Sequence, residues 1–107
     1  MARAKFQTLT EQMFYILLCL HTECYGLDLM EQVRLMTDDR VIIGPGTLYN
    51  LLDQFVDAEM IYETRAEGRR RCYLITDKGK QALKKEDQRL GRQMADYRRI
   101  TGEEQTS

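Results

Sequence analysis

The sequence has little of several residue types on which catalytic and metal chemistry depends. It has no tryptophan, one proline, one histidine and three cysteines in 107 residues. The single histidine, His21, leaves few groups for metal binding or acid–base chemistry, and we expect it to have a core or surface role. Cys19, Cys24 and Cys72 are odd in number and lack a C-x-x-C spacing, which argues against a zinc motif and a disulfide framework. We therefore expect no metal and no cofactor.

Long apolar runs are also missing. The longest, Met13–Leu20, falls well short of the roughly 18 residues of a membrane-spanning helix, and no cleavage-site pattern follows it. Phosphate loops, His-Glu-x-x-His pairs and nucleophile elbows are absent from the sequence as well. With 43% hydrophobic and 31% charged residues, the composition is that of one globular domain. We expect a cytoplasmic protein that is not an enzyme.

The distribution of charge is more informative than the net charge of −1. The segment Thr22–Met60 carries eight acidic and two basic residues, whereas the rest of the chain carries nine acidic and fourteen basic residues. The basic residues gather in the N-terminal arm with Lys5, in the run Arg69–Arg71 and in the last third of the chain. Because a local field steers a polyanion to its site, these segments are candidates for contact with nucleic acid.

The first half of the chain predicts three helices. The first begins at Thr8 or Thr10, which compete as N-caps, and ends near His21. The second is expected from about Tyr25 to Thr37, and the third begins in Gly44–Thr47 and ends near Ala58. Steps of three give the second helix a buried stripe of Leu27, Met30, Val33 and Met36. The residues expected inward on the third helix are Leu48, Leu51, Leu52, Phe55 and Val56.

The second half predicts a hairpin and a long last helix. The strands are Met60–Arg65 and Arg71–Ile75, with a tip at Ala66–Arg69, and the helix runs from Thr76 or Asp77 to about Ile100. The order α-α-α-β-β-α, mainly α with a small β-hairpin, is that of a winged helix-turn-helix in the α+β class. We expect a winged-helix domain over 1–76, a dimerisation helix over 77–101 and a flexible tail over 102–107.

Two segments suit contacts with DNA. At the start of the third helix, Pro45 and Gly46 allow close backbone approach, and free N–H groups can contact a phosphate. Thr47 and Tyr49 carry hydroxyls that suit phosphates, and the carboxamide of Asn50 suits a base edge. The arginines of the hairpin tip suit phosphates or a narrow minor groove, and Arg69 and Arg71 share a face if all three are extended. An ordinary helix start and a solvated charge run are the alternatives.

The last helix carries a seam that the chain itself is too small to cover. Leu83, Leu90 and Tyr97 are spaced by seven, and Met94 lies on the same side, which gives a seam interrupted by Asp87. Packing on the chain's own core is the alternative, but the length of the helix favours a homodimer, which also suits two-fold DNA half-sites.

Several segments together resemble the PadR family of transcriptional regulators, over roughly Thr8–Ile100. They are Leu9–Glu11, Phe14–Leu18, Tyr25–Gly26, Gly44–Tyr49, Arg69–Arg71 with Tyr73, and Ile75–Thr76 with Lys78–Gly79. The resemblance implies a winged-helix dimer, usually a repressor that releases DNA on binding a phenolic acid or a hydrophobic drug. The smaller subfamily, with a single C-terminal helix, dimerises through its first and last helices, which adds Met13 and Leu17 to the expected interface. Leu27 and Cys72 depart from residues common in the family, and the lack of tryptophan excludes a drug site built on that residue.

Two functions stay open at this point. The first is a sequence-specific repressor that binds a palindromic operator in double-stranded DNA. Its expected DNA contacts are Lys5, Pro45, Gly46, Thr47, Leu48, Tyr49, Asn50, Arg69, Arg70 and Arg71. Its small hydrophobic or phenolic effector would bind at the dimer interface between Met13, Leu90, Met94 and Tyr97, for which core packing is the other interpretation. The second is a ligand-sensing or protein-interaction module that does not bind DNA, as the acidic middle segment suggests.

Overall fold

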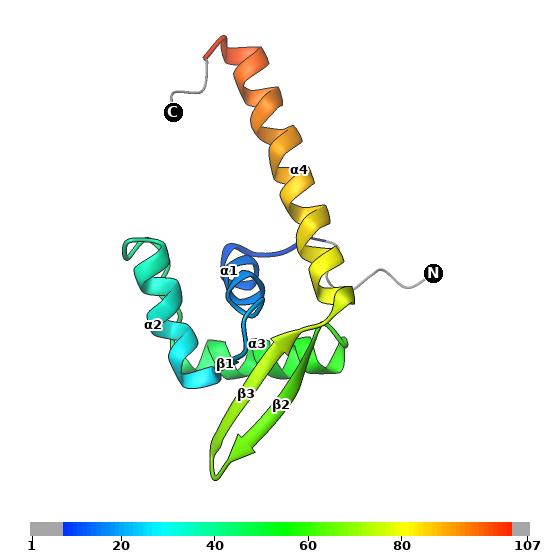
Figure 1. Ribbon diagram of the computed structural model, residues 1–107. Coiled ribbons are helices and arrows are strands. Elements are labelled where there is room, and N and C mark those ends of the chain that lie inside the picture. Colours follow the sequence, from blue (N-terminus) through cyan, green and yellow to red (C-terminus); the bar gives the residue numbers. More distant parts are fainter. Residues whose placement is uncertain (1–7, 104–107) are drawn as a thin grey trace.

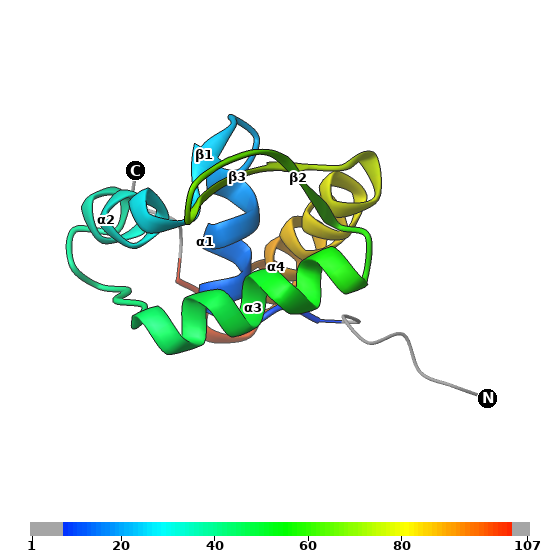
Figure 2. The ribbon, with the colours of Figure 1, turned by 90° about the horizontal axis from the view of Figure 1, so that it is seen from below.

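The computed structural model describes residues 8–103 and confirms the predicted order of helices and hairpin, with one additional strand. The elements are α1 (Glu11–Cys19), β1 (Cys24–Tyr25), α2 (Gly26–Met36), α3 (Pro45–Asp57), β2 (Ile61–Glu67), β3 (Arg70–Ile75) and α4 (Asp77–Thr101). The hairpin of β2 and β3 stands at one end of the molecule and α4 rises away from it at the other (Figure 1). Seen from below, α3 and the hairpin lie on the same end of the molecule (Figure 2). This α+β arrangement is a winged helix-turn-helix.

The strand that the sequence analysis missed is β1. It pairs antiparallel with β3, with Cys24 opposite Tyr73 and Tyr25 opposite Cys72, so the sheet order is β1-β3-β2. A strand of two residues is too short to show the alternation of apolar and polar residues by which strands are predicted. Its effect is to attach the start of α2 to the hairpin.

Capping threonines set the starts of α1 and α4. The side-chain oxygen of Thr10 accepts a hydrogen bond from the Met13 N–H at 3.2 Å, so Thr10 is the N-cap of α1. At α4, the Thr76 hydroxyl accepts from the Gly79 N–H at 3.0 Å and donates to the Glu59 carbonyl at 2.7 Å. One side chain therefore caps α4 and ties it to the turn before β2.

The core lies between the four helices and the sheet. Its largest fully buried side chains include Phe55, Ile16, Leu17, Leu20, Leu29, Leu48, Leu52 and Ile61. The stripe predicted for α2 is wrong, because Leu27 and Met36 are 52% and 50% exposed while Leu29 and Val33 are buried. Apolar residues occur all round α2, so a step of three along the sequence does not identify the face that packs on α1, α3 and β3. Val56 of α3, also predicted inward, is exposed.

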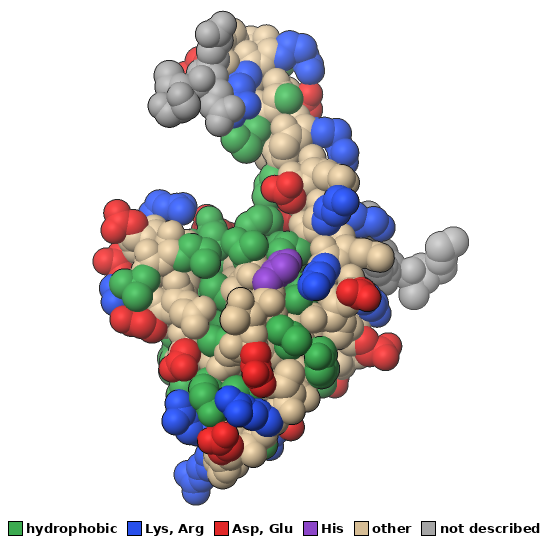
Figure 3. Space-filling view, in the orientation of Figure 1, with side chains coloured by type: hydrophobic (Ala, Val, Ile, Leu, Met, Phe, Trp, Pro, Cys, Tyr) green, Lys and Arg blue, Asp and Glu red, His purple; other side chains and the backbone are tan. Residues whose placement is uncertain are grey.

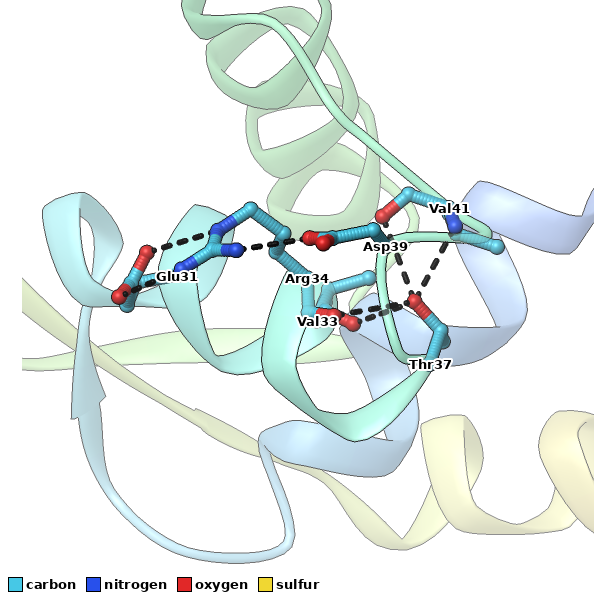
Figure 4. A network of polar contacts seen from close by, with 6 residues as sticks. All are labelled: Glu31, Val33, Arg34, Thr37, Asp39 and Val41. Carbon is cyan, nitrogen blue, oxygen red and sulfur yellow. Dashed lines mark hydrogen bonds and ion pairs between the residues drawn. The ribbon is translucent and has the colours of Figure 1, made fainter.

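A buried threonine holds the connection between α2 and α3. The Thr37 hydroxyl donates to the Val33 carbonyl at 2.8 Å and accepts from the Val41 N–H at 3.1 Å (Figure 4). In the segment that follows, which is neither helix nor strand, Val41 and Ile43 are buried and Ile42 is exposed. Thr37 thus fixes the path by which the chain reaches α3.

Arg34 makes ion pairs on the surface of the same connection. Arg34 binds Glu31 at 3.0 Å and Asp39 at 2.7 Å (Figure 4). Asp38 and Asp39 have φ values of 53° and 64°, a left-handed conformation that Asp tolerates better than most residues. Arg34 thus connects α2 to this turn through pairs whose carboxylates are largely exposed.

Candidate nucleic-acid interface

The first turn of α3 lies at the surface with no side chain capping it. Gly44 is the N-cap and makes no side-chain hydrogen bond, and Pro45 occupies the first helical position. A Cβ on Gly46 would meet nothing within 4 Å, so the space in front of this turn is open. The N–H groups of the turn and the positive end of the helix dipole are therefore available to an anionic group.

Five of the six α3 residues predicted to contact DNA are exposed and one is not. Pro45, Gly46, Thr47, Tyr49 and Asn50 are exposed. Leu48 has no exposed surface and packs in the core, which corrects its prediction as a DNA contact. Its place on the helix explains the difference, because the neighbouring Thr47 and Tyr49 project from other directions around the axis. The predicted contact Lys5 lies outside the described residues 8–103.

The three arginines of the hairpin tip have different surroundings. Arg69 lies in the turn after Gly68, whose φ is +61°, and no partner of its side chain is found in the described chain. The Arg70 guanidinium lies 4.2 Å from the centre of the Tyr25 ring. Arg71 pairs with Glu63 across the hairpin at 3.4 Å. Since Arg69 is in the turn and not in β3, the condition under which Arg69 and Arg71 would share a face is not met.

Of the exposed α3 residues predicted to contact DNA, Tyr49 meets the wing arginines in one cleft. It is lined by Tyr25, Gly26, Leu27, Tyr49, Asp53, Arg69, Arg70, Arg71 and Tyr73. The phenol of Tyr73 can donate a hydrogen bond, and burial raises its pKa above the ordinary value. Three arginines and one carboxylate, that of Asp53, line the cleft, although Arg71 is paired with Glu63 outside the lining. In Figure 3 Lys and Arg side chains lie at the hairpin end, interspersed with Asp and Glu, and also along α4.

Tyr25 is a site residue that the sequence analysis did not single out as a contact. It is the N-cap of α2 and the last residue of β1, and its ring lies below Arg70 and 5.9 Å from Arg65. The only sequence signal is its place just before a predicted helix, beside Gly26. Its contact with Arg70 depends on the pairing of β1 with β3, which no local pattern showed.

The two halves of α4 have different environments. Gly79, Leu83 and Glu86 are buried against the core, whereas the distal half projects away from the domain (Figure 1). Along the same face, Leu90 is half-buried and Met94 and Tyr97 are 49% and 59% exposed. Asp87, which is exposed, interrupts this seam as predicted, and only the distal part of the seam is uncovered.

Two residues predicted for a dimer interface belong to the core of this chain. Leu17 has no exposed surface and Leu83 is 6% exposed, because α1 and the first turns of α4 pack on each other. Met13 is half-buried on α1 and retains accessible surface. Leu17 and Leu83 therefore support α1 and α4 from inside, which corrects their prediction as interface contacts.

A buried carboxylate of α4, that of Glu86, lies beside the start of α1 and is paired with the partly exposed Arg89 of the same helix. Glu86 is 4% exposed and accepts a hydrogen bond from Arg89 Nε at 2.9 Å. This bond holds the pKa of the Glu86 carboxyl below its usual value. Glu86 is thus a charged residue in the interior, where an amphipathic helix normally carries apolar side chains. Beside the pair lies a second cleft lined by Leu9, Thr10, Glu11, Phe14, Tyr15, Glu86, Arg89 and Leu90.

The cysteines and the histidine have structural positions. Cys19, Cys24 and Cys72 are all free and buried, and burial raises the pKa of the Cys24 thiol to about 11, so it is protonated at neutral pH. The ring of His21, which is exposed, is 3.0 Å from the Leu18 carbonyl oxygen. Within residues 8–103, no cluster of His, Cys, Asp and Glu has an arrangement that would hold a metal ion. No helix in that range has the length and apolar character needed to cross a bilayer.

Comparison with solved structures finds the same fold in other regulators. A PadR-like transcriptional regulator from Bacillus cereus is 26% identical, with a TM-score of 0.69 over 86% of this chain and 92% of that one. A transcriptional regulator from Clostridium thermocellum, at 23% identity, has a TM-score of 0.65 over 81% of this chain and 90% of that one. RosR from H. salinarum is 20% identical and has a TM-score of 0.65, over 90% of this chain and 99% of that one. At these last two identities the likeness is one of fold.

Comparison with protein families identifies the chain directly. None of the curated proteins matches it. The model of the transcriptional regulator PadR-like family, however, matches residues 16–85, which span α1 beyond its first turn, the wing and the first part of α4. Members of this family are transcriptional regulators and not enzymes, in agreement with the sequence analysis. The chain therefore belongs to the PadR-like family of transcriptional regulators.

Proposed function

We propose that this regulator binds double-stranded DNA in a sequence-specific manner, with α3 in the major groove and the hairpin on the adjacent backbone or minor groove. The observation that carries the proposal is the cleft in which Tyr49 of α3 meets Arg69, Arg70 and Arg71 of the wing. The exposed Thr47 and Asn50 belong to the same helix start. Hydroxyl and carboxamide groups can contact base edges and phosphates, while the arginines supply the charge that attracts the backbone.

The acidic middle segment does not oppose this proposal. On α2 and the turn after it, Glu31 and Asp39 are paired with Arg34. The hairpin of β2 and β3 carries four arginines and two glutamates. The module that binds no DNA, left open by the sequence, would need an acidic surface across α3 and the wing, and the arginines of the cleft argue against one.

The unit that binds DNA in this proposal is a homodimer. The distal half of α4 presents Met94, Tyr97 and Ile100 at 49%, 59% and 77% exposure, on a helix that leaves its own domain. Monomeric proteins seldom keep such apolar residues in water along an extended helix, and a second copy of the chain would cover them. A two-fold dimer places two α3 helices for a palindromic operator.

Repression and release by an effector extend the same proposal. Of the residues predicted for the effector site, only Leu90 lines the cleft between α1 and α4. Its other lining includes the apolar Leu9 and Phe14 and the charged Glu11, Glu86 and Arg89. Such a site suits a small hydrophobic or phenolic compound. A thermal-shift screen of phenolics and planar drugs tests this part, and a flat response from every compound would contradict it.

A gel-shift experiment tests DNA binding. The wild-type protein is titrated into a duplex taken from the region upstream of its own gene, with excess non-specific competitor and at several salt concentrations. We expect a competitor-resistant complex that weakens with salt. Arg69→Ala should weaken it, whereas Lys84→Ala, which removes the same charge from the exposed side of α4 outside the cleft, should not. No complex at micromolar protein would refute the proposed function.

A further inference from the structure

The ring of Tyr25 lies near two wing arginines, Arg65 at 5.9 Å and Arg70, which is the nearer. Arg65 is also paired with Glu23 and Glu67. The Arg70 guanidinium lies 4.2 Å from the ring centre, whereas Arg71 is engaged by Glu63 at 3.4 Å. Among residues 8–103 no carboxylate lies within ion-pair distance of Arg70. A guanidinium on an aromatic face keeps the N–H groups in its plane free, because the ring occupies its face and not its edge.

Tyr25 itself is anchored outside the hairpin tip. Its backbone pairs with Cys72 as the end of β1, and it forms the N-cap of α2. The next residue, Gly26, packs so closely that an added Cβ would lie 3.4 Å from Cε1 of Tyr49 on α3. The residue pair Tyr25–Gly26 therefore contacts the wing on one side and α3 on the other.

We propose that Tyr25 is a positioning residue that sets the place of the Arg70 guanidinium relative to α3, so that its N–H groups are aimed at a DNA phosphate before DNA arrives. This inference rests on the proposed function. An arginine side chain has many rotamers, and restricting them in the free protein lowers the entropy lost on binding. Tyr25 need not contact DNA for this effect, since it acts through Arg70.

A double-mutant cycle measures the coupling. Binding of the upstream duplex is measured for the wild type, Tyr25→Leu, Arg70→Lys and the double variant. Arg70→Lys keeps the charge but loses the planar group, and we expect it to weaken binding by about 3- to 10-fold in the wild type. In the Tyr25→Leu background it should have less than about a twofold effect, and Tyr25→Phe, which keeps the ring, should bind like the wild type.

The outcomes separate this inference from the proposed function. Arg69→Ala, made with and without Tyr25→Leu, should weaken binding by the same factor in both, because Arg69 does not contact the ring. Suppose that the wild type binds DNA but Arg70→Lys weakens binding equally in both backgrounds, or that Tyr25→Phe loses as much affinity as Tyr25→Leu. Either result refutes the role of Tyr25 while DNA binding stands. If the wild type binds no DNA, both are refuted.

A second measurement needs no variant and no DNA. In the free wild-type protein, nuclear magnetic resonance should show a ring-current shift and restricted motion for the Arg70 Nε–H, unlike that of Arg69. An Arg70 side chain as mobile as that of Arg69 would overturn the inference even if Tyr25→Leu failed to fold.

Discussion

Gly79, in the first turn of α4, lies directly against the backbone of Met60, so that a Cβ on Gly79 would stand 2.2 Å from the Met60 carbonyl oxygen. The backbone of Met60 also accepts a hydrogen bond from the Thr76 N–H at 2.9 Å. The start of α4 is thereby fixed to the turn between α3 and β2. This contact sets the direction in which α4 leaves the domain.

The Gly79 contact predicts opposite effects for two glycine substitutions in one helix. Gly79→Ala should lower the free energy of unfolding by about 2 kcal/mol or more, because backbone must move to admit a methyl group. Gly91→Ala, where nothing lies within 4 Å, should raise it by about 0.5–1 kcal/mol. Urea unfolding at one protein concentration measures both. A Gly79→Ala variant as stable as the wild type would show that α4 does not pack on Met60 in this way.

The hydrogen bonds of Thr37 are expected to stabilise the turn that leads to α3. Thr37→Val keeps the shape of the side chain but leaves the buried Val41 N–H without its acceptor, so we expect a loss of about 1–3 kcal/mol. Thr22→Val, at an exposed site, should change stability by less than about 0.5 kcal/mol. Chemical denaturation measures the stability of the two variants and the wild type. A Thr37→Val variant as stable as Thr22→Val would refute the role given to the Thr37 hydroxyl.

The buried carboxylate of Glu86, paired with Arg89, predicts a pH dependence of stability. The pKa of Glu86 is lower in the folded protein than its ordinary value of 4.5, mainly because of the hydrogen bond from Arg89. A depressed carboxyl pKa adds stability above the unfolded value, and this stability is lost as the pH falls through the folded pKa. Glu86→Gln should therefore be less stable than the wild type near pH 7, with a gap that narrows below about pH 4.5.

Asp96 provides the control for that experiment. It pairs with Arg99 at 2.9 Å on the same helix, but both side chains are more than 60% exposed. Asp96→Asn should change stability by less than about 0.5 kcal/mol. The test is to measure the free energy of unfolding of each variant across the acid range. A difference in stability between Glu86→Gln and the wild type that does not change with pH would contradict the assigned pKa shift.

The exposed distal half of α4 predicts the site of dimerisation. Tyr97→Asp should weaken self-association by at least about tenfold, because it places a charge in the proposed apolar interface. Gln88→Asp adds the same charge to an exposed position on the opposite face and should leave association unchanged. Sedimentation equilibrium measures both. Equal dimer dissociation constants for the two variants would show that the interface lies elsewhere.

The sequence predicted those features that depend on local chemistry. The cap at Thr76 or Asp77, the proline at the start of α3 and Gly68 at the hairpin tip each follow from what one short segment can do, and the helix order followed from them. The exposure of Thr47, Tyr49 and Asn50 could be foreseen because Leu48, Leu51 and Leu52 identify the inner face of a strongly amphipathic helix.

The features that were not predicted depend on contacts between distant segments. Nothing near Glu86 in the sequence shows that its carboxylate is covered by the start of α1. Leu27 and Met36 resemble core residues in type, and only the packing of α2 shows that Leu29 and Val33 are buried instead. The contact of Tyr25 with Arg70 joins residues on β1 and β3. It requires the pairing of these strands, which cannot be predicted because a strand of two residues has no recognisable sequence pattern.

The central claim is that α3 reads the bases of DNA while the wing binds its backbone. The most direct test measures the affinity of wild type, Tyr49→Ala and Arg70→Ala for a duplex from upstream of the gene and for a scrambled duplex, over a range of salt. Tyr49→Ala should reduce the preference for the first duplex. Arg70→Ala should weaken both duplexes alike and lower the slope of log affinity against log salt by about one unit. Unchanged affinity, preference and slope in both variants would contradict the account.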